Sequence, residues 1–391
     1  MRCPDNIFEM SSAYLRSRFR KLALRGVEAV SDATRSLLSA VSGAQPPPWG
    51  PYVQNVSASS SVIAWTSDEP NVGSVEYGET SKLGRIELDA QFDRRHAVVL
   101  SDLNPGSTYH YRVTEVGGVP VTGRFRTAPV GKGSRFSFAV IGDSGHGGKN
   151  QLAVAELLER LEPDLVLHTG DVVYPSGEDS HYDPRFFMPY RELIREVPVF
   201  PVLGNHDVEK GNGAAYLKNF HLPSNNPQGT KRYYSLDWGN AHFVALDSEL
   251  YYEDGGGSKE EQKEWLEQDL KVTRQPWRFV VFHRPIYSSS EHGSDETIRE
   301  DLEPIFALHE VDMVFCGHDH DYERTVPIKG VIYVVSGGGG RDPYVAGRNK
   351  WTAFSKSTHH AVLVRIDGEH LSLEAVEPDG TVIDRLDLDR P

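Results

Sequence analysis

Cysteine and long apolar runs are nearly absent from this 391-residue chain, and positive charge is outnumbered. Cys3 and Cys316 are too few for a disulfide scaffold, and Cys316 ends the expected strand 311–316, which predicts a small buried core residue. No stretch reaches the roughly 18 apolar residues of a membrane-spanning helix. With 41 Lys and Arg against 56 Asp and Glu, the net charge of −15 argues against a nucleic-acid-binding surface.

Residues 1–44 are a basic leader in which no clear secretory signal is present. Five basic residues lie between positions 16 and 25, followed by a few apolar residues. Arg25, Glu28 and Asp32 interrupt every candidate apolar core of a signal peptide. We expect a weakly amphipathic helix or a disordered leader, and hence a cytoplasmic protein. A membrane-surface or export segment, in a secreted or periplasmic protein, is the alternative.

A proline-rich linker at 45–48 precedes a segment whose strand spacing is typical of a β-sandwich. Up to residue 130, short runs rich in Val, Tyr and Thr recur about every ten residues between Gly, Pro, Asn and Asp. The run 103–106 followed by Tyr109 is similar to the E–F corner of fibronectin type III domains, where a tyrosine hydroxyl bonds to nearby backbone. We therefore predict a fibronectin III-like N-terminal domain over residues 45–130.

From residue 131 to residue 391 the pattern changes to strands that alternate with helices. An amphipathic helix is expected at 149–161, and Ser258 with Glu261 forms a capping-box pattern for a helix through residue 272. Apolar strands are expected at 136–141, 164–168, 197–203, 279–282, 313–316, 332–335, 361–366 and 371–376. The expected fold class is α/β, or α+β for the whole chain: a β-sandwich followed by four layers in the order helix, sheet, sheet, helix.

Five short motifs, in one fixed order, each end or directly follow one of these strands. They are Gly-Asp-Ser-Gly from 142, Gly-Asp-Val-Val-Tyr from 170, Gly-Asn-His-Asp from 204, Val-Val-Phe-His from 280 and Gly-His-Asp-His from 317. The candidate metal ligands in them are Asp143, Asp171, Tyr174, Asn205, His283, His318 and His320. Hard oxygen donors mixed with imidazoles suit iron, manganese or zinc. Because open α/β sheets bind ligands at the carboxyl ends of their strands, we expect these side chains to meet in one cleft.

Each motif has a plainer explanation when it is taken alone. Gly-Asp-x-Gly is a common turn, Asn205 could be only a turn residue, and Tyr174 could be a packed aromatic. A lone Gly-His-x-His is often structural or an incidental metal site. The joint occurrence at successive strand ends instead favours one metal site that all five motifs share.

In these motifs the sequence closely resembles the purple acid phosphatases, within the calcineurin-like metallophosphoesterase superfamily, from about residue 50 to the C-terminus. The resemblance implies a ferric ion held by Asp143, Asp171, Tyr174 and His320. It also implies a divalent iron, zinc or manganese ion held by Asp171, Asn205, His283 and His318, with Asp171 bridging. At Gly145 many other metallophosphoesterases carry a histidine ligand, and Tyr174 takes over that role in purple acid phosphatases.

Three further residues are candidates for proton transfer or phosphate binding. His206 directly follows a predicted ligand and is expected to donate to a phosphate oxygen, with Asp207 orienting its ring. His292 lies nine residues after His283, where the family often has a histidine that donates to the leaving group. The alternatives are a supporting role for His206 and an exposed loop histidine at 292. His146 is one residue too late to be a ligand, and we interpret it as a loop or substrate-side residue.

The sequence thus predicts a dinuclear metal-dependent phosphoric ester hydrolase of the acid phosphatase type. We expect metal-activated hydroxide to hydrolyse phosphate monoesters, on small molecules or phosphoproteins, without a covalent intermediate. One alternative is a phosphodiesterase acting on nucleotides or phospholipid head groups with the same metals. The other is a binding or adhesion protein with a vestigial site, against which the complete ligand set argues. The physiological substrate, the divalent metal and the oligomeric state do not follow from the sequence.

Overall fold

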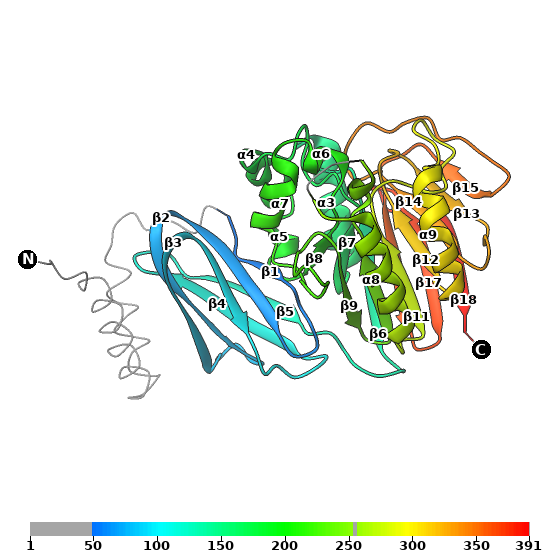
Figure 1. Cartoon of the computed structure of the whole chain (residues 1–391). Coiled ribbons are helices and arrows are strands. Elements are labelled where there is room, and N and C mark those ends of the chain that lie inside the picture. Colours follow the sequence, from blue (N-terminus) through cyan, green and yellow to red (C-terminus); the bar gives the residue numbers. More distant parts are fainter. Residues whose placement is uncertain (1–48, 253–255, 391) are drawn as a thin grey trace, which may run out of the picture.

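The computed structural model describes residues 49–252 and 256–390, so the predicted leader and linker lie outside the described residues. An all-β N-terminal part lies beside a larger part built of strands and helices (Figure 1). The described strands form three sheets of five, six and seven strands. No helix in the described ranges is long and apolar enough to cross a membrane.

The five-stranded sheet is antiparallel throughout. Its strands are β1 (Tyr52–Gln54), β2 (Ser61–Gly78), β3 (Arg85–Leu100), β4 (Thr108–Glu115) and β5 (Val121–Arg126). The runs 61–65 and 73–77 have the pattern of two separate short strands in the sequence, but both belong to the single strand β2. The pairing of β2 with β3 shifts register between Thr66 and Gly73. The polar residues in this stretch resemble a turn in the sequence, but they form a bulge within the strand.

The tyrosine contact expected at residues 103–109 is present. The backbone N–H of Asn104 donates to the hydroxyl oxygen of Tyr109 at 2.9 Å, and the Tyr109 ring is buried. This bond ties the start of β4 to the turn that precedes it. The fibronectin III-like identity of this part stays a prediction.

The other two sheets form the larger part of the chain. The six-stranded sheet has the order β18 (Val382–Asp389), β17 (His370–Val376), β16 (Ala361–Asp367), β6 (Arg135–Ile141), β7 (Leu165–His168) and β8 (Val199–Pro201). The seven-stranded sheet has the order β15 (Thr352–Lys356), β13 (Tyr322–Thr325), β14 (Ile332–Ser336), β12 (Met313–Cys316), β11 (Trp277–Val281), β10 (Ala241–Ala245) and β9 (Tyr234–Trp238). Both sheets mix parallel and antiparallel pairs, with β6, β7 and β8 parallel in the first and β10, β11, β12 and β14 parallel in the second.

The two sheets pack face to face through large apolar side chains. The ring of Phe138 on β6 lies 5.1 Å from those of Phe243 and Phe279 and 5.9 Å from that of Phe315, all on the seven-stranded sheet. Four buried aromatic rings thus fill the space between the sheets, and their burial supplies much of the free energy that holds the layers together.

Helices cover the outer faces of both sheets (Figure 1). Helix α3 (Lys149–Leu161) has the predicted bounds and contacts β16. Helices α8 (Lys259–Val272) and α9 (Glu296–Leu308) share an apolar cluster with the outer face of the seven-stranded sheet. The Ser258 side chain accepts a bond from the Glu261 N–H, as the capping pattern predicted. The expected four layers are therefore confirmed.

Shorter helical segments connect these elements. They are α4 (Asp179–Tyr182), η1 (Asp183–Phe187), α5 (Arg191–Ile194), α6 (Asn205–Val208), η2 (Gly211–Gly213), α7 (Ala214–Asn219) and η3 (Ser248–Tyr251). Several of them lie between the N-terminal sheet and the strands that carry the motifs (Figure 1).

The N-terminal sheet is joined to the rest of the chain by buried aromatic contacts and side-chain bonds. The Tyr111 hydroxyl donates to the carbonyl oxygen of Arg195 at 2.8 Å. Arg95 pairs with Asp179 at 2.9 Å and lies over the ring of Trp49, and the Trp49 ring lies 3.9 Å from that of Phe187. The two parts therefore share one continuous apolar core.

This interface leads to a prediction about truncation. A chain that begins at residue 131 is expected to keep its metal ligands but to aggregate, because Phe187 and its neighbours lose their apolar partners. Light scattering and metal content of the purified protein measure both effects. A chain that begins at residue 45 is the control, and we expect its specific activity to be unchanged. Full solubility of the longer truncation would contradict the structural role of the N-terminal sheet.

Candidate metal centre

The motif residues lie directly after parallel strands of both sheets. In the six-stranded sheet, β6, β7 and β8 precede Asp143, Asp171 and Asn205. In the seven-stranded sheet, β11 and β12 precede His283 and His318. The packing of the two sheets brings these carboxyl ends together, so that side chains far apart in the sequence come into contact.

Asp143, Tyr174 and His320 form one half of the site. The Tyr174 hydroxyl donates to Oδ1 of Asp143 at 3.3 Å and lies 3.2 Å from Nε2 of His320. The same His320 nitrogen is 3.6 Å from Oδ1 of Asp143. All three side chains are buried. These are three of the four side chains predicted to hold the ferric ion.

The other half centres on His283. Its Nε2 lies 3.0 Å from Oδ1 of Asn205, 3.2 Å from Nδ1 of His318 and 3.5 Å from Oδ1 of Asp171. Ligand atoms of Asp143, Asp171 and His283 all lie within 4.8 Å of one another, which links this half to the first. The structure thus brings all seven predicted ligands into one cluster.

Backbone carbonyls set the orientation of two imidazoles. Nδ1 of His283 lies 2.8 Å from the carbonyl oxygen of Thr169, and Nδ1 of His320 lies 3.1 Å from that of Asp342. A carbonyl oxygen only accepts, so each Nδ1 carries the hydrogen. Each Nε2 then faces the cluster with its lone pair, as a metal ligand requires.

Burial disfavours the charged forms of the carboxylates and of the imidazoles in the cluster. Burial raises the pKa of Asp143, and the Asp171 carboxylate raises it further. Burial also lowers the pKa of His318 to about 2 and that of His320 to about 4, and lowers the pKa of His283 well below its usual value. Two close buried carboxylates beside neutral nitrogen donors are a costly arrangement without positive charge. The donor set therefore fits a pair of cations.

Gly145 explains why tyrosine, and not histidine, completes this cluster. The N–H of Tyr174 donates to the carbonyl oxygen of Gly145 at 2.7 Å. A Cβ at Gly145 would come within 1.8 Å of the carbonyl oxygen of Val172, so the backbone is too close for any side chain. A histidine at position 145 is incompatible with this loop packing, whereas the Tyr174 hydroxyl reaches Asp143.

His206 lies beside the cluster, and its ring packs against the ring of Tyr174. The ring centres of His206 and Tyr174 are 4.5 Å apart. Nδ1 of His206 lies 2.5 Å from the carbonyl oxygen of Pro175, and its Nε2 is 3.9 Å from Oδ2 of Asp171. This places Nε2 toward the predicted metal ligands, where a phosphate oxygen would lie.

The contacts of Asp207 differ from the predicted ones. Its carboxylate was expected to orient His206, but it accepts backbone N–H bonds from Val172, Val173 and Gly204 at 3.0–3.2 Å. It is fully buried, because the first turn of α6 directs its side chain back onto the preceding loop. In this structure the Asp207 carboxylate therefore holds the second and third motifs together, and the hydrogen bonds of the described residues do not join it to His206.

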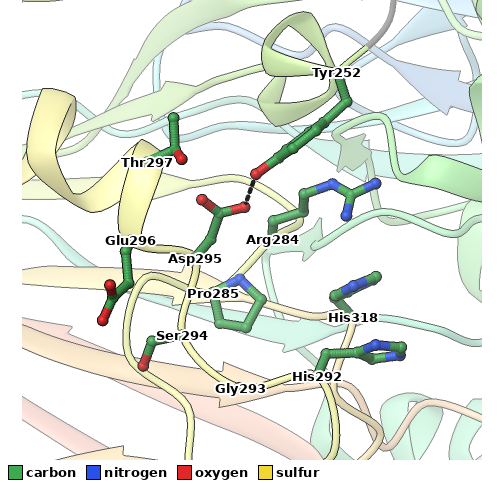
Figure 2. A pocket seen from close by; sticks show the side chains of 10 residues that line it. All are labelled: Tyr252, Arg284, Pro285, His292, Gly293, Ser294, Asp295, Glu296, Thr297 and His318. Carbon is green, nitrogen blue, oxygen red and sulfur yellow. Dashed lines mark hydrogen bonds between the residues drawn. The ribbon is translucent and has the colours of Figure 1, made fainter.

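His292 lies on the wall of a pocket of about 320 Å³ next to the predicted metal ligand His318. Figure 2 shows the two rings side by side, with Arg284 and Tyr252 further along the same wall. The His292 and His318 rings are stacked, with centres 4.1 Å apart and planes at 25°. His292 and His318 both line this pocket, so it borders the cluster. The structure thus places His292 at the site.

Sequence reasoning missed two residues that shape the site. Asp319 accepts the backbone N–H of His292 at 2.8 Å and that of Gly293 at 3.2 Å, and thereby holds the His292 loop. In the sequence, the position of Asp319 between the predicted ligands His318 and His320 could have indicated this role. Tyr344 stacks on His320 with ring centres 4.1 Å apart, and no motif marked it.

Comparisons with known proteins agree with this geometry. Residues 136–322 match the model of the calcineurin-like phosphoesterase family. Acid phosphatase type 7 of Mus musculus is 27% identical over an alignment that covers 84% of this chain and 87% of that protein. Purple acid phosphatase 21 of Arabidopsis thaliana is 32% identical over an alignment that covers 74% of this chain and 70% of that protein.

A solved structure shares the fold. The purple acid phosphatase from yellow lupin (Lupinus luteus) seeds is 23% identical and has a TM-score of 0.76, over 87% of this chain and 74% of that one. The similarity reaches beyond the residues of the family model. The shared fold therefore includes strands of the N-terminal sheet, or the C-terminal strands β16 to β18, in addition to the motifs. With its five motifs gathered into one candidate metal site, this chain belongs to the purple acid phosphatases, which are phosphoric ester hydrolases.

Proposed function

We propose that this chain hydrolyses phosphate monoesters as an acid phosphatase, with one ferric ion and one divalent iron, zinc or manganese ion. The convergence of Tyr174, Asp143 and His320 on one side of Asp171, with Asn205, His283 and His318 on the other, carries the proposal. The phenol and carboxylate oxygens suit a trivalent cation, whereas an amide and two imidazoles suit a divalent one. Substrates would be phosphorylated small molecules or phosphoproteins.

The chain's own residues bind the phosphate and move protons. When bound, the two cations hold the phosphoryl oxygens and activate water for the attack on phosphorus. Nδ1–H of His206 donates a hydrogen bond to the carbonyl oxygen of Pro175. When the ring is protonated, its Nε2–H is therefore the group that can donate to a phosphoryl oxygen. His292, on the pocket wall, is placed to protonate the leaving alkoxide. Asp319 keeps the His292 loop against the site.

Replacing Tyr174 by phenylalanine tests the ferric assignment. Iron-loaded protein is expected to show a visible phenolate-to-iron charge-transfer band, and Tyr174→Phe should lose it because the ligand oxygen is gone. Absorption spectra and metal analysis of the same samples measure this. Tyr344→Phe is the matched control, since Tyr344 stacks on His320 through its ring and should keep the band. A colourless wild-type enzyme, fully active with divalent metals alone, would contradict the assignment.

A substrate comparison tests the reaction type. Protein of defined metal content is assayed with 4-nitrophenyl phosphate and with bis(4-nitrophenyl) phosphate. We expect faster hydrolysis of the monoester. Faster hydrolysis of the diester would instead support a phosphodiesterase, and no hydrolysis of either ester with both metals bound would support a binding protein.

A further inference from the structure

Three basic side chains gather beside Tyr174 and form no ion pair with any carboxylate in the described part of the chain. Arg185 donates from Nη1 to the carbonyl oxygen of Tyr174. The guanidinium carbon of Arg341 lies 4.7 Å from the centre of the Tyr174 ring. His146 directly follows Gly145, whose carbonyl oxygen accepts the Tyr174 N–H at 2.7 Å, and a Cβ at the neighbouring Gly147 would lie 3.6 Å from Cγ of Arg185. The pKa of His146 is lowered by burial and by the charges of Arg341 and Arg185, and raised by that of Asp342. Arg185, Arg341 and His146 are named here the Tyr174-side cluster.

The Tyr174-side cluster contains polar atoms that lack a hydrogen-bond partner. Nε of Arg341 and Nδ1 of His146 are buried atoms without a hydrogen-bond partner in the structure. Elsewhere at the site an arginine is neutralised: Arg284 pairs with Glu249 at 2.8 Å. All three side chains of the cluster are only half-buried, so an anion from solvent can reach them. Nε of Arg341 is always a donor, and a buried donor without an acceptor is unfavourable, so an anionic acceptor would satisfy it.

The backbone fixes Arg341 relative to the metal ligands. The N–H of Arg341 donates to the carbonyl oxygen of Asp143 at 3.0 Å. Three residues later the N–H of Tyr344 donates to the carbonyl oxygen of His320 at 2.9 Å. The loop that carries Arg341 is therefore tied at two points to the half of the site that contains Tyr174. This position places a cation at the edge of the phosphate site in a chain whose net charge is −15.

We propose that the Tyr174-side cluster is a binding site for a phosphate-like oxyanion next to the metal centre, with Arg341 as its main donor. A guanidinium group binds phosphate oxygens through two parallel N–H bonds, and it stays charged at every physiological pH. The oxyanion has two sources: the phosphoryl group that is hydrolysed, or a second phosphate group on the substrate. The link to catalysis rests on the proposed function, whereas the binding of the oxyanion does not.

The test measures binding of two probes by calorimetry to metal-loaded protein. The probes are inorganic phosphate and methylenediphosphonate, a stable diphosphate analogue. Arg341→Gln is expected to weaken binding about tenfold or more for at least one probe, because a charge-assisted pair is lost. Arg341→Lys should recover part of the loss, and Arg185→Gln should show a smaller loss of the same kind. Arg348→Gln is the control, since Arg348 is an exposed residue that contacts Ala353.

Each outcome separates the possibilities. Weaker binding of both probes assigns the cluster to the reacting phosphoryl group, and weaker binding of the diphosphonate alone assigns it to a second phosphate group. Unchanged affinity for both probes in Arg341→Gln and Arg185→Gln would overturn the proposal. Loss of metal from these variants would also overturn it, because the arginines would then only support Tyr174. A wild-type protein that binds phosphate through Arg341 without hydrolysing esters would refute the proposed function alone.

Discussion

Alanine in place of His292 is expected to slow the hydrolysis of alkyl phosphates by about 10²–10⁴-fold, the usual contribution of a general acid. The same change should have little effect on 4-nitrophenyl phosphate, whose leaving group needs no proton. The reason is position: His292 stacks on the predicted ligand His318, and both residues line the same pocket. Steady-state rates on both substrates, with metal content measured on the same samples, check the expectation.

The comparison variant for this experiment is His206→Ala. His206 lies against Tyr174 on the other side of the cluster and is expected to contact the phosphoryl group, which both substrates share. Its loss should slow the two substrates alike. If His292→Ala, with both metals retained, also slowed them equally, His292 would not be the acid, and a role in binding would take its place.

The second large effect is expected at Gly145. A methyl group there would lie 1.8 Å from the carbonyl oxygen of Val172, so Gly145→Ala must push apart the loops that carry Asp143 and Tyr174. We expect the free energy of unfolding to fall by about 1–3 kcal/mol, as overpacking usually costs. The charge-transfer band should also disappear, because Tyr174 moves away from its metal. Chemical denaturation and absorption spectra measure the two effects.

Gly133→Ala is the matched control for this substitution. A Cβ at Gly133 meets no atom within 4 Å, and the residue lies in the loop before β6, away from the motifs. It should leave stability and spectrum unchanged. A coloured, fully stable Gly145→Ala protein would show that the loops adjust at little cost, and the explanation for the absence of a histidine at 145 would fail.

Local sequence patterns were sufficient for many of the elements and for the identity of the candidate ligands. Helix α3 has the predicted bounds and β12 has the predicted four residues. An apolar run followed by a glycine turn marks the carboxyl end of a strand, and that end is where an α/β sheet binds ligands. The same reasoning indicated the family from five motifs of four or five residues each, and the comparisons confirmed it.

Patterns failed where a contact outweighed a local preference. The polar residues between 66 and 73 read as a turn, but pairing with β3 keeps them inside one long strand. Asp207 follows His206 in sequence and was assigned to it, yet three backbone N–H groups of the motif loops bind its carboxylate. A buried carboxylate takes the strongest donors within its reach, and neighbours in space supply them.

The sequence by itself determined which chemical groups this protein can offer to a metal pair, because those groups sit in short motifs whose backbone geometry is local. Only the tertiary structure decided their mutual distances, since the packing of two sheets brings Asp143 to His320 and His283 to Asp171. It alone also revealed Asp319, Tyr344 and the Tyr174-side cluster. Those roles depend on contacts across as many as about two hundred residues of chain, and no local pattern encodes such contacts.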